Sequence, residues 1–217
     1  TATTEIYTLS LHDGSSDLRC FDDDNIVHVD GQVNPVRDKE IIDAELQIKD
    51  LETIDSRIAK VQKQAQTGGD KQAKQAYEVL VKFKEALEQG KSARTVTFET
   101  KDEQKIAHDL FLLTSKPVMY VCNVDEASAV KGNKYVDAVR EAVKDENAEI
   151  LVVAAKIESE IAEFETYDER QMFLQEIGLE ESGVSRLIKS AYNLLNLQTY
   201  LTAGVQEVRA WTFEKGW

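Results

Sequence analysis

Two short apolar runs, at 118–121 and 150–154, constrain the fold more than any other feature of the sequence. Both are nearly continuous and rich in β-branched residues, which is typical of strands covered on both faces. Residues 135–143, between them, have the three-and-four spacing of a helix. A strand, a helix and a strand at this length predict a right-handed crossover in a parallel sheet, and therefore an α/β fold.

Polar residues follow each of these predicted strands. Asn123 and Glu126 come after the first, in an Asn-x-x-Glu pattern, and the sequence Ala154-Ala155-Lys156 comes after the second. In open α/β sheets ligands bind beyond the carboxyl ends of the strands, where a base can meet side chains of one loop and main-chain groups of the next. Four residues are a weak pattern, and ordinary strand-to-helix turns are the alternative interpretation.

A long helical segment precedes the first of these strands. Asn34-Pro35 and Asp38 are helix-entry signals, with Asp38 as the expected cap, and apolar residues then recur at heptad spacing. Gly68-Gly69 ends this helix, and a second helix is expected from Asp70 to Gly90. The stripe of the first helix comprises Ile41, Ala44, Ile48, Leu51, Ile54, Ile58, Val61 and Ala65, and that of the second Ala73, Tyr77, Leu80, Phe83 or Lys84, and Leu87.

These two helices are predicted to pack as an antiparallel hairpin. Two interpretations are open. Either the apolar stripe does nothing more than hold the two helices of the hairpin together, or the hairpin is an arm that docks on a partner. Helical spacing also predicts helices at 102–113, 158–163 and 168–176. A further helix is expected at 183–195, with a wide core-facing stripe, and strand character at 205–213. The stripe comprises Val184, Leu187, Ile188, Ala191, Leu194 and Leu195.

The charge distribution limits the classes of partner. The chain has 26 Lys and Arg against 40 Asp and Glu, a net charge of −14, so a nucleic-acid contact must be local rather than general, and DNA binding is not expected. No apolar run is long enough for a membrane helix, and no secretory signal is recognisable, which favours the cytoplasm. Cys20 and Cys122 are expected to be reduced, buried thiols.

Motifs for catalysis and metal binding are absent from the sequence. It contains neither Gly-x-x-x-x-Gly-Lys-Ser/Thr nor Gly-x-Gly-x-x-Gly, no zinc spacing and no nucleophile elbow. The acidic run 22–24 is expected to be a solvated loop rather than a cation site. His28 could position water or a phosphate oxygen, or be an ordinary surface or packed histidine.

Three stretches match a known family: 19–31, 116–126 and 195–212. On these residues the chain from about Asp17 to Trp217 resembles the YchF-type ATPases, also called Obg-like ATPases, of the Obg-related P-loop NTPases. The resemblance implies a P-loop NTPase (G) domain with a parallel sheet, interrupted by an antiparallel, coiled-coil-like helical hairpin and followed by a TGS domain.

Site residues follow from the resemblance position by position. Asn123, Val124 and Glu126 would form the base-recognition loop, and 154–156 (Ala154, Ala155, Lys156) the second base-contacting loop. Asn-x-x-Glu, in place of Asn-Lys-x-Asp, implies use of ATP and in addition GTP, because the longer carboxylate meets a different set of donors. His28 matches a catalytic candidate. The resemblance implies two partners, the ribosome and a nucleotide bound with Mg²⁺. It also implies that the protein is regulated by oxidation.

The resemblance also implies a division of the chain. Residues 1–16 look like a non-native adapter peptide, 17–32 a remnant of the G domain, 33–115 the helical insertion, 116–203 the rest of the G domain and 204–217 the lead-in to a truncated TGS domain. The P-loop, switch regions and Mg²⁺ ligands of the family have no counterpart in this sequence. We therefore expect a fragment of an ATPase that does not itself hydrolyse nucleotide. The alternative is a non-enzymatic helical-hairpin module that binds a protein or ribosomal partner.

Overall fold

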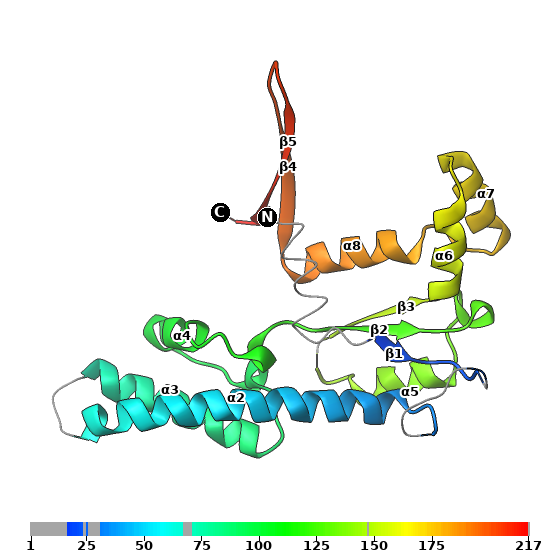
Figure 1. The fold of residues 1–217 in the computed structure, drawn as a ribbon. Helices are drawn as coiled ribbons and strands as arrows, with labels where there is room; N and C mark the ends of the chain where they lie inside the picture. The colour runs from blue at the N-terminus through cyan, green and yellow to red at the C-terminus, as the bar shows by residue number, and fades with distance from the viewer. Residues whose placement is uncertain (1–16, 24, 26–30, 67–70, 147, 217) are drawn as a thin grey trace. The chain divides into compact units, whose positions relative to one another are not determined.

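The computed structural model describes residues 17–216, except 24, 26–30, 67–70 and 147 (Figure 1). Its chain forms two compact units. Unit 1 comprises Thr1–Lys39 and Val118–Trp217, and unit 2 comprises Glu40–Pro117. No helix in the described part of the chain is long and apolar enough to cross a membrane.

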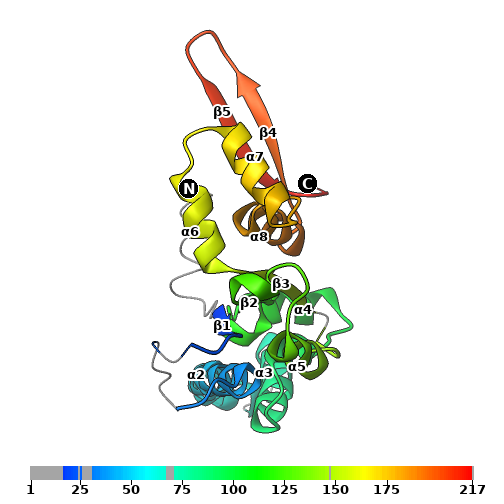
Figure 2. The same cartoon turned by 90° about the vertical axis from the view of Figure 1, so that its right-hand side faces the viewer.

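Unit 1 contains the predicted parallel sheet. Strands β1 (Asp17–Arg19), β2 (Met119–Asn123) and β3 (Glu149–Val153) lie in the order β1-β2-β3, with both pairs parallel. Helix α5 (Lys134–Ala142) covers one face, and helices α6 (Ala155–Glu163) and α8 (Gly183–Leu194) lie on the other (Figures 1 and 2). The α/β prediction and the crossover are confirmed.

The core of unit 1 forms where these elements bury their apolar side chains. Strand residues Leu18, Tyr120 and Cys122 pack with Val136 and Val139, which lie three apart on α5. Each of these five side chains is at most 6% exposed. The spacing of three on the helix and the near-continuous apolar strand are what a sheet covered on both faces requires.

Two elements of unit 1 differ from the sequence-based prediction. Val184 and Ile188, expected in the core, are 51% and 53% exposed, because α8 packs against β3 along one narrow side where Gly183 and Ser190 are its buried residues. Strand character was expected only at 205–213. The structure instead has an antiparallel hairpin of β4 (Leu197–Ala203) and β5 (Val208–Glu214). Helix α7 (Tyr167–Glu176) agrees with the prediction.

The helical hairpin of unit 2 is formed by α2 and α3. Helix α2 runs from Pro35 to Gln66, and α3 runs from Lys71 to Glu88. Their antiparallel alignment is fixed by Lys84 Nζ, 2.7 Å from Asp55 Oδ1, and by Gln47 Nε2, which donates to the Gly90 carbonyl at 3.2 Å. Figure 1 shows the two helices side by side. The predicted stop at Gly68-Gly69 and the start at Asp70 lie outside the described residues.

The seam of the hairpin is shorter than the heptad pattern suggests. Ile54 is fully buried among Val79, Leu80 and Phe83, whereas Ile41 and Ile48 are 52% and 58% exposed. The stripe therefore does not extend over its amino-terminal part. The prediction that Asp38 caps α2 is also wrong: the Asn34 side chain accepts from the Arg37 amide at 3.1 Å, and Asp38 pairs with Arg37.

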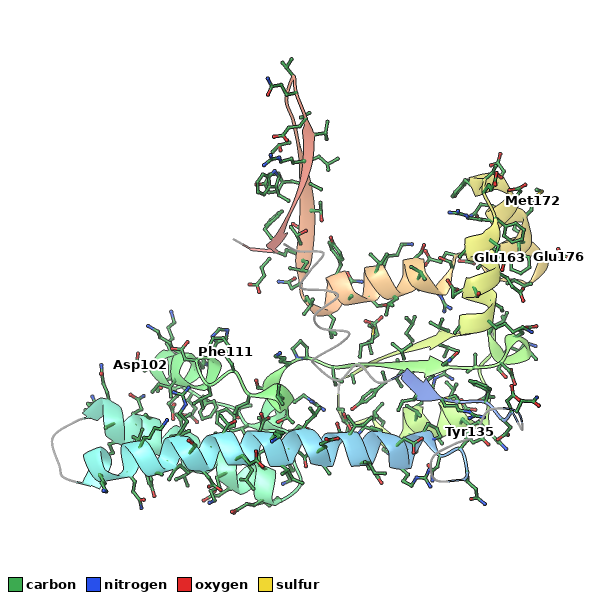
Figure 3. The ribbon with its side chains drawn as sticks, viewed as in Figure 1. Asp102, Phe111, Tyr135, Glu163, Met172 and Glu176 are labelled. Carbon is green, nitrogen blue, oxygen red and sulfur yellow. The ribbon has the colours of Figure 1, made fainter. Side chains whose placement is uncertain are left out.

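The helix expected at 102–113 is interrupted. Helix α4 covers Lys101–His108, and a 3-10 turn follows at Leu113–Ser115. Phe111, labelled beside α4 in Figure 3, has a φ of 51° and is 72% exposed, so the periodic pattern breaks there. A further 3-10 turn, Ala93–Thr95, precedes α4. Asp50 of α2, 2% exposed, accepts from the amides of Leu113 and Thr114, both at 2.7 Å.

Candidate functional site

The carboxyl ends of the three parallel strands meet at one edge of the sheet, as the sequence predicts for β2 and β3. Asn123 ends β2 and pairs in register with Arg19 of β1 and Val153 of β3. Its carbonyl accepts from the Cys20 amide at 2.7 Å. The Val124 amide donates to the Val153 carbonyl at 2.9 Å, so the ladder continues one residue past the strand.

Asn123 also joins the two predicted base-contacting loops. Its side-chain Oδ1 accepts from the Ala155 amide, 3.1 Å away, at the first residue of α6. An amide side chain that bonds the neighbouring loop fixes the separation of the two loops. The expectation that these loops are neighbours is confirmed, and Asn123 braces them.

A charged pair spans the same edge. The ammonium of Lys156, on α6, forms an ion pair with the Glu126 carboxylate from the loop after β2. This hydrogen bond raises the pKa of Lys156, with a further contribution from the negative charge of Glu126. Both side chains are exposed to solvent, where such pairs contribute little to stability. The pair can therefore open when a ligand offers either group a new partner.

Apolar residues form the floor beneath this pair. Val124 and Ala154 are 3% and 4% exposed and belong to the core of unit 1, whereas Glu126, Ala155 and Lys156 are exposed. The six residues predicted for the two loops thus fall into three groups. Val124 and Ala154 form a buried apolar floor, the Asn123 side chain holds the loops together, and the other three residues are exposed. His28 lies outside the described residues.

Two residues that support the loops were not predicted. Asp125 accepts from the Ser128 amide at 2.8 Å and caps the short 3-10 turn Glu126–Ser128. Asn133 caps α5 by accepting from two amides, and its Nδ2 donates to the Cys20 carbonyl at 2.7 Å. An Asn directly before a helical pattern is a capping signal, so Asn133 could have been recognised from the sequence.

The acidic loop after β1 is held by α5. The Tyr135 hydroxyl, labelled in Figure 3, donates to Asp22 Oδ1 at 2.6 Å, and this bond is the largest cause that raises the Tyr135 pKa. Asp23 accepts from the Asn25 amide at 2.8 Å. In the described part of the chain no group of three or more acidic, His or Cys side chains could hold a metal ion.

Two buried thiols lie directly behind the strand ends. Cys20 and Cys122 are both free and 0% exposed. The Cys20 thiol forms a hydrogen bond with Cys122, which together with burial raises the pKa of Cys20, and the same bond lowers the pKa of Cys122. The prediction of reduced, buried cysteines agrees with this arrangement.

A second carboxylate orders the helices that follow β3. Glu158 of α6 accepts from the amides of Gly183 and Val184, at 2.6 and 3.2 Å, at the start of α8. A negative charge at this end of a helix is favourable because it meets free N–H groups. A Cβ on Gly183 would lie 2.8 Å from Val153 Cγ1, so only glycine fits this contact.

Comparison with known proteins identifies the family to which the chain belongs. The chain is 54% identical over 201 residues to the ribosome-binding ATPase YchF of Bacillus subtilis, covering 92% of the chain and 54% of that protein. The chain is a homologue of the YchF-type, Obg-like ATPases. The resemblance inferred from the sequence is thereby confirmed. No family model matches the chain.

Other relatives agree with this assignment. The ribosome-binding ATPase YchF of Escherichia coli O157:H7 is 46% identical over 199 residues, covering 92% of the chain and 54% of that protein. Obg-like ATPase 1 of Rattus norvegicus is 38% identical over 213 residues, covering 96% of the chain and 53% of that protein. The solved YchF GTPase of Schizosaccharomyces pombe matches with a TM-score of 0.80 at 30% identity, over 92% of the chain and 54% of that structure. The chain spans about half the length of the relatives that it matches.

Proposed function

We propose that the carboxyl edge of the sheet in unit 1 recognises the purine base of ATP, and in addition that of GTP, as the base-reading part of a ribosome-binding NTPase. One observation carries this proposal: Asn123 braces the two loops while Glu126 and Lys156 face each other across them. Homology to proteins named as ribosome-binding ATPases supports the choice of ligand.

Each residue has a distinct role in this proposal. Glu126 is exposed, so its carboxylate oxygens can accept hydrogen bonds from an exocyclic amine of the base. Lys156 has an exposed aliphatic stem that can cover the flat face of the base while its ammonium stays with Glu126. Val124 and Ala154 provide the apolar floor, and Asn123 together with the Ala155 amide holds the spacing.

The residues fit the base better than they fit the rest of the nucleotide. The sequence has no glycine-rich phosphate loop with its lysine, and the described residues have no grouping suited to Mg²⁺. Phosphoryl transfer depends on such positive groups to stabilise the transferred charge. We infer that this chain by itself does not hydrolyse ATP, and His28 stays a proposed catalytic residue of the complete site. Mg²⁺-dependent ATP turnover by the purified chain would contradict this inference.

Titration with adenosine, which has no phosphate, tests the base site directly. We expect the amide resonances of Val124, Glu126, Ala155 and Lys156 to shift together, while those of Lys91 and Leu201 stay in place as internal references. Uridine is the matched control, because a pyrimidine covers less of the floor. Shifts distributed over the whole chain, or equal shifts with uridine, would contradict the proposal. Replacing Glu126 by Asp should move the preference from adenosine toward guanosine.

Three parts of the proposal concern partners and regulation. The ribosome is the proposed partner, and the cytoplasm is the proposed location. Redox regulation is proposed to act through Cys20 and Cys122, the hydrogen-bonded thiols behind the strand ends.

Treatment with a diazene oxidant would transfer two electrons and two protons from the thiols to the oxidant and leave a disulfide. Intact-mass analysis that finds no such loss of hydrogen under native conditions would exclude this route.

A further inference from the structure

The amino-terminal half of α2 exposes apolar side chains that the hairpin does not cover. Ile41 and Ile48 are 52% and 58% exposed, and Ala44, between them, is exposed as well. The three residues occupy positions i, i+3 and i+7 of the helix, which places them on one side of it. We call these three residues the α2 stripe.

The fold holds this part of α2 from the opposite side. Asp50 comes two positions after Ile48, about half a turn around the helix, and accepts from the Thr114 amide at 2.7 Å. Ile54, one turn further along, is fully buried in the core of unit 2. The backbone beneath the α2 stripe is therefore fixed without a contribution from the stripe itself, so a partner would meet a surface that is already ordered.

Acidic side chains border the α2 stripe. Residues 40–55 contain six acidic side chains and one lysine. Glu45 lies three positions before Ile48 and Glu52 lies four positions after it, and both are exposed. The lysine, Lys49, is 2.8 Å from Glu52 in a solvent-exposed pair, which contributes little to stability and can exchange partners. The surface is therefore apolar at its centre and negative along its edge.

These charges limit what can cover the stripe. Within the described ranges, no three acidic, His or Cys side chains are grouped so that they could hold a metal ion. A nucleic acid or an anionic membrane would be repelled by the carboxylates. A second copy of the stripe would bring the same acidic edge against itself, which is unfavourable across an interface. The charge fits a positively charged protein segment.

We propose that the α2 stripe docks a basic amphipathic helix of a partner protein. Helices recognised in this way present apolar anchors at i, i+3 or i+4, and i+7, which is the spacing of the stripe itself. The small side chain of Ala44 leaves room for a large anchor between Ile41 and Ile48. Lys and Arg beside the anchors would pair with Glu45 and Glu52. This inference goes beyond the base site of unit 1 and does not depend on it.

The test is fluorescence anisotropy of the complete chain with labelled peptides of about 20 residues, long enough to form a helix. The first peptide has Leu at the anchor positions and Lys beside them, and we expect it to bind. In the second peptide Glu replaces Lys, and in the third the Leu residues are spread around the helix. Absence of binding by the first peptide, or equal binding by either of the others, would overturn the proposal.

A double variant of the stripe locates the contact. Ile41→Gln with Ile48→Gln should weaken binding of the first peptide at least about tenfold, because buried apolar anchors contribute most of the affinity of such interfaces. The matched control is Val184→Gln with Ile188→Gln, two apolar residues of α8 that are 51% and 53% exposed, and it should stay within about threefold. Circular dichroism checks that both variants fold. Equal losses in the two, or no loss in either, would contradict the assignment.

A second pair of variants tests the acidic edge. Glu45→Gln with Glu52→Gln should weaken binding about three- to tenfold at low salt and remove most of the salt dependence. The control, Glu78→Gln with Glu85→Gln, removes the same charge from exposed positions of α3. If both pairs of substitutions have the same effect, the peptide responds only to the net charge of the chain, and the proposed docking site is wrong.

Sedimentation equilibrium tests a second copy of the chain as the occupant. Dimers that Ile41→Gln with Ile48→Gln abolishes would show that the stripe is covered by another copy, and the proposal of a basic partner would fail. A monomeric chain, or self-association that the stripe variant leaves unchanged, supports a stripe that is free for the partner helix.

Discussion

The two units of this molecule use their polar groups in opposite ways. In unit 1 the side chains of Glu126 and Lys156, just beyond the strand ends, are exposed and are bonded mainly to each other. In unit 2 the carboxylate of Asp50 is buried and accepts three hydrogen bonds from residues 113–114. An exposed pair contributes little to stability and is available to a ligand, whereas a buried, fully bonded carboxylate is committed to the fold.

Substitution of Asp50 should have the largest effect. In Asp50→Ala the amides of Leu113 and Thr114 and the Thr114 hydroxyl lose their acceptor in the interior, so we expect a loss of about 3–5 kcal/mol in the free energy of unfolding. Chemical denaturation measures the loss, and hydrogen exchange should place it in unit 2. Asp50→Asn, which keeps one acceptor, should be intermediate. A loss below about 1 kcal/mol would remove the contrast between the units.

Gly183→Ala should have the next largest effect on the free energy of unfolding. It tests the packing beside the strand ends of unit 1. The new methyl would meet Val153 Cγ1 at 2.8 Å and Glu158 Oε1 at 2.9 Å, so we expect about 1–3 kcal/mol of destabilisation from overpacking. Gly204→Ala is the matched control, because its Cβ would meet only ordinary contact, 3.6 Å from the Glu207 carbonyl. Equal thermal midpoints for the two variants would show that Gly183 is not sterically required.

Asn123→Ala should change stability by only about 1 kcal/mol, because its bond to the Ala155 amide is exposed. Its effect on adenosine should be much larger, since the two loops lose their fixed spacing. We expect the adenosine-dependent amide shifts to disappear while the fold persists by circular dichroism. Unchanged adenosine binding would show that the bracing bond is not part of the base site, and would weaken the distinction between structural and ligand-binding polar groups.

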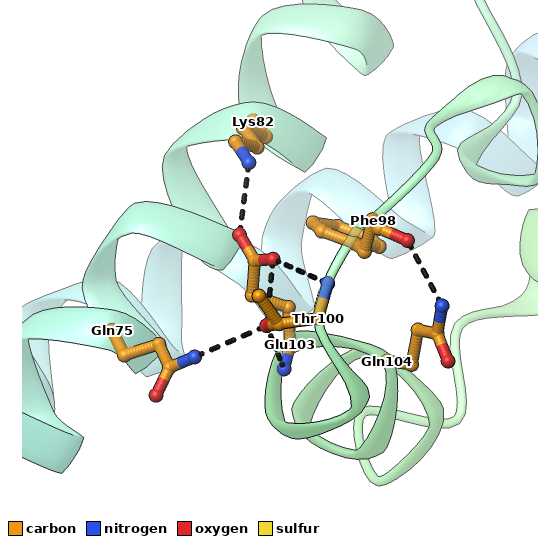
Figure 4. Close-up of polar contacts among 6 residues, drawn as sticks. All are labelled: Gln75, Lys82, Phe98, Thr100, Glu103 and Gln104. Carbon is orange, nitrogen blue, oxygen red and sulfur yellow. Dashed lines mark hydrogen bonds and ion pairs between the residues drawn. The ribbon is translucent and has the colours of Figure 1, made fainter.

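The smallest expected effect is a difference in pKa between the glutamates of two matching helix caps. Thr100 and Glu103 of unit 2 form a capping box, as do Thr166 and Glu169 of unit 1. Figure 4 shows that Glu103 also bonds Lys82, 3.0 Å away, and the lysine is the first cause that lowers the Glu103 pKa to about 2. The pKa of Glu169 is also lowered, through Thr166 alone.

A pH titration by NMR compares the two caps. Because the folded pKa of Glu103 lies below its unfolded value, the unfolded chain binds more protons between them. The stabilisation is therefore complete above about pH 4.5 and is lost as the pH falls toward about 2. Glu169 should titrate at higher pH than Glu103, and Lys82→Met should bring the two together. If Glu103 is unaffected by Lys82→Met, the ion pair does not distinguish the caps.

Sequence patterns predicted the elements whose local signal and burial agree. The strands at 118–121 and 150–154 and the helix between them were found because their side chains are buried in the structure as well as apolar in the sequence. Ile41 and Ile48 have the same apolar spacing, yet they are exposed. The heptad pattern could not show how far the partner helix extends.

The residues of the proposed base site follow from the sequence, but the bonds among them do not. Strand ends and the family pattern led to Asn123, Glu126 and Lys156. That Asn123 bonds the Ala155 amide, and that Lys156 pairs with Glu126, depends on the register of β2 and β3, which no local pattern specifies. The break at Phe111, where φ is 51°, was also missed. Two residues later Leu113 donates to Asp50, more than sixty positions earlier in the chain, and no local pattern shows such a contact.

The pairing of β1 with β2 has a consequence for the order of folding. Leu18 and Cys122 are partners in register, and Asn133 bonds the Cys20 carbonyl across 113 positions of the chain. Closing so long a loop has a large entropic cost and slows folding. The hairpin, by contrast, forms from contacts within 40–117 and can assemble first, which shortens the effective loop that β1 must close. We expect the sheet edge that carries the proposed base site to be the last part of the molecule to fold.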